Sequence, residues 1–211
     1  MPALASASSP PRRIASARRA LLRELLVRET LDGRPMYFAD YWTVLAGRQS
    51  LESIRGSSSL RWVVASYVLQ ALIRRLNGER YWFAANQVGT RLDEHTSLIH
   101  DVAIYEKAAL PPDQINTCYV SVPARVVVEI DVRIDLRDPE DANYVNRKIR
   151  KLLDFGTERV IWVFTDSRQV LLAERGADAW LTMDWHRDIE LLDGQRFNIG
   201  QYLAEQGVLQ G

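Results

Sequence analysis

The chain has 211 residues, of which 47% are apolar and 26% charged, so it is long enough for one domain with a sizeable core. Its 27 basic and 27 acidic side chains cancel, which excludes an overall electrostatic field that would gather nucleic acid from solution. A local basic groove is still compatible with the sequence. Arg and Lys cluster at 12–23, 72–80 and 147–151, although such runs are more often solvated helix faces.

Compartment and cofactor classes are limited by what the sequence lacks. No stretch approaches the roughly 18 consecutive apolar residues of a membrane span, and the first residues carry no apolar segment after a basic start, as a secretory signal would. We therefore expect a cytoplasmic protein with no membrane partner. The single cysteine, Cys118, excludes an intrachain disulfide and a multi-cysteine zinc site, and we expect it to be a small core or strand residue.

The N-terminal quarter is predicted to be helical after a flexible start. Residues 1–13 are rich in Ala, Ser and Pro, a composition typical of a flexible leader. An amphipathic pattern predicts a helix over 14–27 that ends at Asp32-Gly33-Arg34-Pro35, and a second helical piece covers 38–46. Residues 14–50 are therefore expected to form an N-terminal helical extension.

A longer helix and a series of strands follow. The serines at 57–59 offer an N-cap to a helix over 60–76. Strand character then alternates with turn residues, with Asn86 at a turn, over 80–85, 87–92, 97–105, 117–122 and 125–132.

The next helix has clear start and stop signals: Asp138 as N-cap, Pro139 at the first helical position and Gly156 after its end. It is followed by predicted strands at 159–165 and 169–175, and by a tail that contains 180–183, a short strand over 189–192 and a last helix over 198–206. A strand-helix-strand crossover among hairpins implies an α/β (α+β) domain over 51–211, with a mixed sheet flanked by helices.

Lys148 lies where a soluble helix would normally place an apolar residue. It falls in the middle of the apolar face formed by Tyr144, Val145, Ile149, Leu152 and Phe155. A lysine ammonium is seldom buried without a partner, so this position suggests a nearby carboxylate.

Two carboxylates interrupt apolar strands in a similar way. They are Asp101 in the strand over 97–105 and Glu129 in the strand over 125–132. If these strands are neighbours, the two side chains and the carbonyl of Ile130 could bind one hard divalent cation. The Lys148 ammonium would then hold or help deprotonate a water that attacks a phosphodiester.

A plainer interpretation stays open. Asp101 and Glu129 could lie on the solvent face of half-exposed strands, while Lys148 reaches out from the helix edge to Asp141 or Asp131.

Other side chains are candidates for the same site or for an interface. His100, next to Asp101, is a candidate metal ligand or general base, although a lone strand histidine is more often a structural hydrogen-bonding residue. Trp162 and Trp82 are expected in the core. The tryptophans that could line a groove or an interface are Trp42, Trp62, Trp180 and Trp185.

The arrangement from Glu52 to about Thr165 resembles the Uma2 family of bacterial proteins, within the PD-(D/E)XK nuclease superfamily. The elements that carry this resemblance are Glu52-Ser-Ile-Arg-Gly56 before the long helix, His100-Asp101-Val-Ala-Ile, Val127-Val-Glu-Ile130, and Lys148 eight residues before Gly156 and the strand with Trp162. About half of the chain is covered. The sequence departs from the pattern at His100, where the family usually has Pro, and at Ala124, where it commonly has Asp.

The resemblance implies a restriction-endonuclease-like core with Asp101 and Glu129 as ligands of Mg²⁺ or Mn²⁺ and Lys148 as the catalytic lysine. Glu52 would be an accessory carboxylate at the rim. Asp131 stands where the superfamily motif has its lysine and would be accessory, with Lys148 taking that lysine's place from the helix.

The expected activity is therefore a divalent-metal-dependent endonuclease that hydrolyses phosphodiester bonds of nucleic acid, with DNA as the expected substrate and a homodimer as the expected assembly. The alternatives are a catalytically silent nuclease-like module that binds nucleic acid or protein, and a structural partner in an oligomer, which exposed strand edges would favour.

Overall fold

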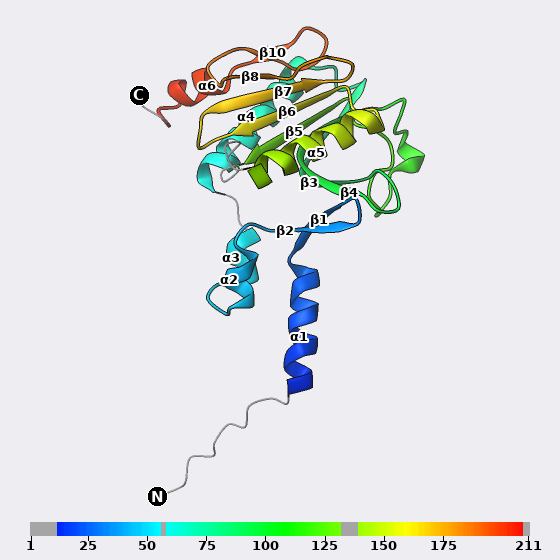
Figure 1. Cartoon of the computed structure of the whole chain (residues 1–211). Helices are drawn as coiled ribbons and strands as arrows, with labels where there is room; N and C mark the ends of the chain where they lie inside the picture. The colour runs from blue at the N-terminus through cyan, green and yellow to red at the C-terminus, as the bar shows by residue number, and fades with distance from the viewer. Residues whose placement is uncertain (1–11, 56–57, 132–138, 209–211) are drawn as a thin grey trace, which may run out of the picture. The chain divides into compact units, whose positions relative to one another are not determined.

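The computed structural model describes residues 12–55, 58–131 and 139–208 (Figure 1). The chain divides into two compact units, one formed by Met1–Glu29 with Pro35–Gly56 and the other by Thr30–Arg34 with Ser57–Gly211. None of the helices in the described ranges is long and apolar enough to cross a membrane.

The first unit is mainly helical. Its helices are α1 (Arg12–Leu25), α2 (Tyr41–Leu45) and α3 (Leu51–Arg55). The Arg55 guanidinium donates a hydrogen bond to the carbonyl oxygen of Leu25 at 2.6 Å, which ties α3 to the end of α1. The predicted helical piece over 38–46 thus corresponds to the short helix α2.

The predicted extension of the first helix to Val27 is wrong. The chain leaves α1 after Leu25, and Val27–Leu31 forms strand β1, which is followed by β2 (Arg34–Tyr37). Asp32 and Gly33 between these strands have φ values of 52° and 72°. Positive φ at both central residues is typical of a two-residue hairpin turn, so the stop signal at these residues marks a hairpin and not a helix end alone.

The second unit is built on one large mixed sheet. Within this unit the strand order is β4-β5-β6-β7-β8, and β3 also pairs with β4. The remaining strands of this sheet are β3 (Tyr81–Arg91), β4 (Ser97–Glu106), β5 (Val126–Asp131), β6 (Arg159–Phe164), β7 (Gln169–Glu174) and β8 (Leu181–Asp184). A small second sheet consists of β9 (Ile189–Glu190) and β10 (Arg196–Phe197).

Strands β5 and β6 are parallel, and α5 (Pro139–Phe155) connects them, whereas β3, β4 and β5 pair antiparallel, as do β6, β7 and β8. Parallel neighbours need such a crossover connection. The predicted α/β (α+β) mixed sheet flanked by helices is therefore confirmed. The predicted N-cap of α5, Asp138, lies outside the described residues.

Helices cover both faces of the central strands, with α5 in front of the sheet and α4 (Ser59–Arg75) behind it in Figure 1. Ser58 caps α4 by accepting a hydrogen bond from the backbone N–H of Arg61. The core on the α4 face combines buried residues of α4, the central strands and the C-terminal part of the chain, including α6 (Ile199–Glu205).

Strand β5 is buried along its whole length. Val126, Val128 and Ile130 belong to the core on the α4 face. Side chains alternate along a strand, so Glu129 and Asp131 point to the opposite face, toward α5. Two acidic side chains are thereby buried on the face where Lys148 lies.

Two strand predictions and one residue prediction need correction. The segments 80–85 and 87–92 belong to one strand, and the expected turn at Asn86 is a β-bulge, where Asn86 and Gln87 have φ of 72° and 62°. The segment 117–122 makes only an isolated bridge between Thr90 and Val120. Cys118 in this segment is exposed and not in the core.

The tryptophans divide differently from the prediction. Trp162 is fully buried, as expected, but Trp185 is buried as well and belongs to the core on the α4 face. Trp42 and Trp62 are exposed.

Candidate active site

The candidate site lies where β4 and β5 stop pairing. Their ladder ends at Val102 opposite Val128. One further step of the same register would place Asp101 opposite Glu129, so the two predicted carboxylates come from adjacent strands at the same level of the sheet. In place of ladder pairing, Asp101 Oδ2 accepts a hydrogen bond from the backbone N–H of Ile130 at 2.8 Å.

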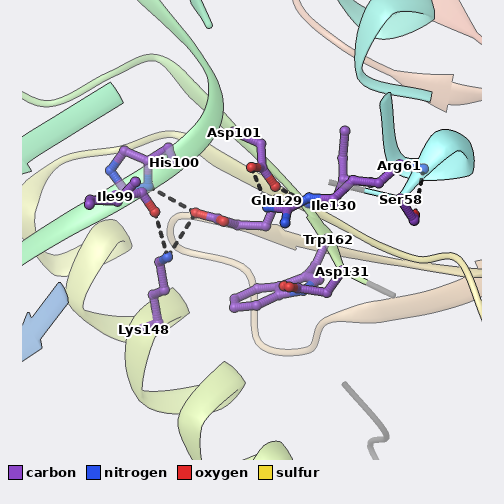
Figure 2. Close-up of polar contacts among 10 residues, drawn as sticks. All are labelled: Ser58, Arg61, Ile99, His100, Asp101, Glu129, Ile130, Asp131, Lys148 and Trp162. Carbon is purple, nitrogen blue, oxygen red and sulfur yellow. Dashed lines mark hydrogen bonds and ion pairs between the residues drawn. The ribbon is translucent and has the colours of Figure 1, made fainter. Parts of the chain in front are cut away.

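Lys148 reaches this place from α5 (Figure 2). Its Nζ lies 3.0 Å from Glu129 Oε1 and donates to the carbonyl oxygen of Ile99 at 2.8 Å. Both charged side chains have 0% exposure. Nζ also lies 5.9 Å from the ring centroid of Tyr144 and 5.7 Å from that of Trp162, close enough for a cation–π contribution.

The plainer interpretation of Lys148 is thereby contradicted. Glu129 does not lie on a solvent face, and Lys148 does not reach out of the helix edge toward water. Burying two charges is costly, and their mutual attraction offsets that cost only where geometry and further hydrogen bonds are good. Lys148, which the sequence pattern placed on an apolar helix face, therefore forms a buried ion pair with Glu129.

His100 is a third member of this buried group. Its Nδ1 lies 2.9 Å from Glu129 Oε1, and the side chain has 0% exposure. Its other ring nitrogen, Nε2, makes no hydrogen bond within the part of the chain that the structure describes. The contact of His100 with the Glu129 carboxylate helps to orient that carboxylate.

Asp101 is held from the other face of the sheet. Arg61, in the first turn of α4, places Nη2 2.5 Å from Asp101 Oδ1. The two side chains are 23% and 13% exposed, so this pair lies nearer to solvent than the pair of Glu129 and Lys148. The two carboxylates are thus each neutralised by a cation, and the two cations come from helices on opposite faces.

Asp131, the predicted accessory residue, does not take part in the contacts of Lys148 described above. Its Oδ2 accepts a hydrogen bond from Trp162 Nε1 at 2.9 Å, and Trp162 lies directly opposite Glu129 on β6. Asp131 is therefore next to the candidate site, and its carboxylate is held by Trp162 on β6.

Glu52 lies in α3, which belongs to the other unit. Its own backbone N–H and the Ser50 hydroxyl donate hydrogen bonds that lower the pKa of the Glu52 carboxyl below its usual value. The accessory role of Glu52 stays a prediction.

Sequence reasoning missed Arg61. A signal was present, because Arg61 continues the buried stripe of α4 that contains Val64 and Val68, at helical spacing. A charged residue in that stripe needs a partner in the same way that Lys148 does.

The donor set at this place fits a divalent cation in chemical type. The Asp101 and Glu129 carboxylates and the Ile130 carbonyl are hard oxygen ligands of the kind Mg²⁺ and Mn²⁺ take. Across the described ranges, no group of three or more His, Cys, Asp and Glu side chains could hold a metal ion. A cation here would therefore have two carboxylates, with backbone and water oxygens completing its shell.

Comparison with known proteins adds evidence on the fold. No protein-family model matches the chain, and no curated protein matches it in sequence. Solved structures do match. One is a crystal structure of a protein described as a putative nuclease belonging to DUF820 from Anabaena variabilis, with a TM-score of 0.57 and 10% sequence identity, over 70% of this chain and 82% of that chain.

At 10% sequence identity, the structural similarity supports the fold and does not extend to the activity of that protein. The mixed sheet with flanking helices is a restriction-endonuclease-like nuclease fold, as the sequence predicted. The resemblance to the Uma2 family remains a prediction from the sequence, and the chain is similar to a nuclease-like protein in structure.

Proposed function

We propose that this protein is a divalent-metal-dependent endonuclease that hydrolyses phosphodiester bonds of nucleic acid, with DNA as its substrate. One observation carries the proposal. In a nuclease-like fold, Asp101 and Glu129 stand at one level of adjacent strands, and the Lys148 ammonium lies 3.0 Å from Glu129. Two carboxylates can hold a divalent cation, and an ammonium beside them can hold the water that attacks a phosphodiester.

The roles follow from the side chains. Asp101, Glu129 and the Ile130 carbonyl would hold Mg²⁺ or Mn²⁺, and such an ion, when bound, offsets the charge that develops on the phosphoryl oxygens. The Lys148 ammonium donates hydrogen bonds, so it would orient the attacking water and favour loss of the water's proton. His100 would keep the Glu129 carboxylate in place.

Access to the site is expected on the Asp101 side. Glu129 and Lys148 are fully buried, whereas Arg61 and Asp101 are partly exposed. A cation that approaches there meets the Arg61 guanidinium first. Binding would therefore require Arg61 to leave Asp101, and the released guanidinium would be available to a substrate phosphate.

A specific observation also favours a second function, a catalytically silent nuclease-like module. The described contacts engage both carboxylates within the protein, Asp101 with Arg61 and Ile130 and Glu129 with Lys148 and His100. A scaffold whose site is satisfied internally could bind nucleic acid or protein without hydrolysing it.

Plasmid nicking separates the two functions. The native chain with Mg²⁺ or Mn²⁺ is expected to nick supercoiled plasmid, and Asp101→Asn is expected to abolish nicking while circular dichroism shows an unchanged fold. Arg150→Gln, an exposed change on α5, is the control and should retain activity. Equal nicking by the native chain and Asp101→Asn would show that another protein in the preparation is responsible.

Binding without nicking would favour the silent module. Retention of labelled duplex DNA by native chain that shows no nicking with either ion would sink the enzymatic proposal. The homodimer is part of the same proposal, because a two-fold assembly would present one site to each strand of a duplex. Light scattering that gives a monomer mass at working concentration would contradict it.

A further inference from the structure

A polar groove lies at the other end of α4, away from the candidate active site. It has a volume of about 500 Å³ and lies between the last turns of α4, β10 and α6. Arg61 and Arg74 are separated by 13 residues of one helix, which corresponds to roughly 20 Å at 1.5 Å per residue. The groove is therefore separate from the carboxylates discussed above.

Arginine side chains dominate the charge of this groove. Arg74, Arg75 and Arg196 line it. Arg74 and Arg75 are exposed and make no ion pair with any residue in the described part of the chain. Arg196 has only a long contact, 3.9 Å, with Glu190. Three guanidinium groups against two carboxylates, Asp188 and Glu205, leave the lining with a net positive charge, which would favour an anion.

The carboxylates in the wall are already engaged. Asp188 Oδ1 accepts a hydrogen bond from Asn198 Nδ2 at 3.1 Å, and Glu205 Oε1 accepts one from Gln201 Nε2 at 2.8 Å. Within the described part of the chain, neither carboxylate forms an ion pair with Arg74, Arg75 or Arg196. The groove therefore has cationic donors that are not used by its own acidic residues.

An aromatic pair forms another part of the wall. The rings of Tyr67 and Tyr202 stack with centroids 3.9 Å apart and an interplanar angle of 10°. The Tyr67 hydroxyl accepts a hydrogen bond from the backbone N–H of Asn198 at 3.1 Å, which positions that ring. Both tyrosines line the groove and are partly buried, so the organic part of a ligand could pack against them.

We propose that this groove binds a phosphate ester, with the guanidinium groups of Arg74, Arg75 and Arg196 around the phosphate and the tyrosine pair against the sugar or base. Arginine is the side chain best suited to phosphate because its planar donors match two phosphate oxygens at once. The volume lies in the range of small-molecule sites, about 300–1,000 Å³, and is sufficient for a mononucleotide.

Two sources can supply this chemistry, a free nucleotide and a phosphate group of a nucleic-acid strand. Calorimetry with the full chain tests both, with adenosine 5′-monophosphate, adenosine and a short single-stranded oligonucleotide as probes. We expect binding of the monophosphate or the oligonucleotide, and binding of adenosine at least tenfold weaker than that of its monophosphate.

Variants connect the binding to the groove. Arg74→Gln and Arg75→Gln are each expected to weaken binding by about tenfold, the loss of one charge-assisted phosphate contact. Arg150→Gln removes the same charge from the exposed surface of α5 and should leave binding unchanged. If Arg74→Gln and Arg75→Gln weaken binding of the oligonucleotide but not of the monophosphate, the natural source of the phosphate is a nucleic-acid strand.

Two results would overturn the inference. One is that no phosphate-bearing probe binds, and the other is that Arg74→Gln and Arg75→Gln bind the probe as tightly as Arg150→Gln. The inference does not depend on the proposed nuclease activity. Asp101→Asn should abolish nicking and retain phosphate binding, so the failure of one proposal is distinguishable from the failure of the other.

Discussion

The Arg61 guanidinium, from the first turn of α4, lies 2.5 Å from Oδ1 of Asp101, whose Oδ2 accepts the Ile130 N–H. A cation that binds Asp101 must therefore compete with a positive charge that belongs to the protein. This relationship makes Arg61 an internal counter-ion of the candidate site.

Replacing Arg61 by Gln should strengthen binding of Mn²⁺. The substitution removes the competing charge and keeps a polar side chain, so we expect affinity to rise about tenfold, or roughly 1.4 kcal/mol. Calorimetric titration with Mn²⁺ measures this, with Arg150→Gln as the control for a general loss of positive charge. Unchanged or weaker Mn²⁺ binding by Arg61→Gln would contradict the competition.

Replacing Lys148 by Met should strongly destabilise the fold. The change leaves Glu129 buried beside an apolar side chain, and breaking one partner of a buried ion pair costs about 3–5 kcal/mol. Urea unfolding measures the free energy. The double variant Lys148→Met with Glu129→Gln should recover much of the loss, because no uncompensated charge is left.

If the double variant lost as much stability as the two single variants lost together, the pair would not be coupled and the ion pair would contribute no interaction energy. Glu129→Gln alone completes the double-mutant cycle. It leaves the ammonium near an amide oxygen and is expected to be less harmful than Lys148→Met.

Replacing Trp162 by Phe should weaken the fold through a hydrogen bond and not through packing alone. The change removes the Nε1 donor to the buried Asp131 carboxylate, and a hydrogen bond to a charged group contributes about 1.5–3 kcal/mol. Trp82→Phe is the matched control, because Trp82 Nε1 donates to the neutral carbonyl of Leu110. Thermal unfolding of the two variants should show the larger loss for Trp162→Phe.

The Glu106 carboxylate should contribute stability that depends on pH. Hydrogen bonds from Arg80 and Arg125, at 3.1 and 2.8 Å, lower the pKa of Glu106 in the folded chain. A lowered pKa stabilises the fold above the unfolded value of about 4.3, and this stability is lost as pH falls through the folded pKa.

Glu106→Gln is therefore expected to lower the melting temperature at pH 7 and to have progressively less effect toward pH 3. Glu79→Gln, a change at an exposed carboxylate, is the control. A melting-temperature difference that stays constant from pH 7 to pH 3 would exclude this origin.

Sequence patterns anticipated much of the architecture for physical reasons. The 3.6-residue period and caps located the long helices at 59–75 and 139–155 within one or two residues. The apolar face that surrounds Lys148 showed that its charge needed a partner, and the structure supplies Glu129. The fold class followed from the order of strands and the single crossover.

Other features depend on contacts that no local pattern contains. Arg61 pairs with Asp101 across 40 residues of chain, and His100 with Glu129 across 29. The β1–β2 hairpin was missed because Val27–Leu31 is only five residues long and directly follows a helix. A strand that short is defined by its pairing partner more than by its own sequence.

If the candidate site binds a cation, the divergence of β4 and β5 beyond Val102 and Val128 would couple its binding to the stability of the sheet. Along that opening, backbone groups such as the Ile130 N–H and the Ile99 carbonyl have side-chain partners in Asp101 and Lys148. A ligand that binds Asp101 or Lys148 would replace the hydrogen bonds that these side chains now form with the backbone of the sheet. The free energy of ligand binding would therefore include the cost of breaking these hydrogen bonds. A variant in which this end of the sheet is less stable would bind the ligand more tightly.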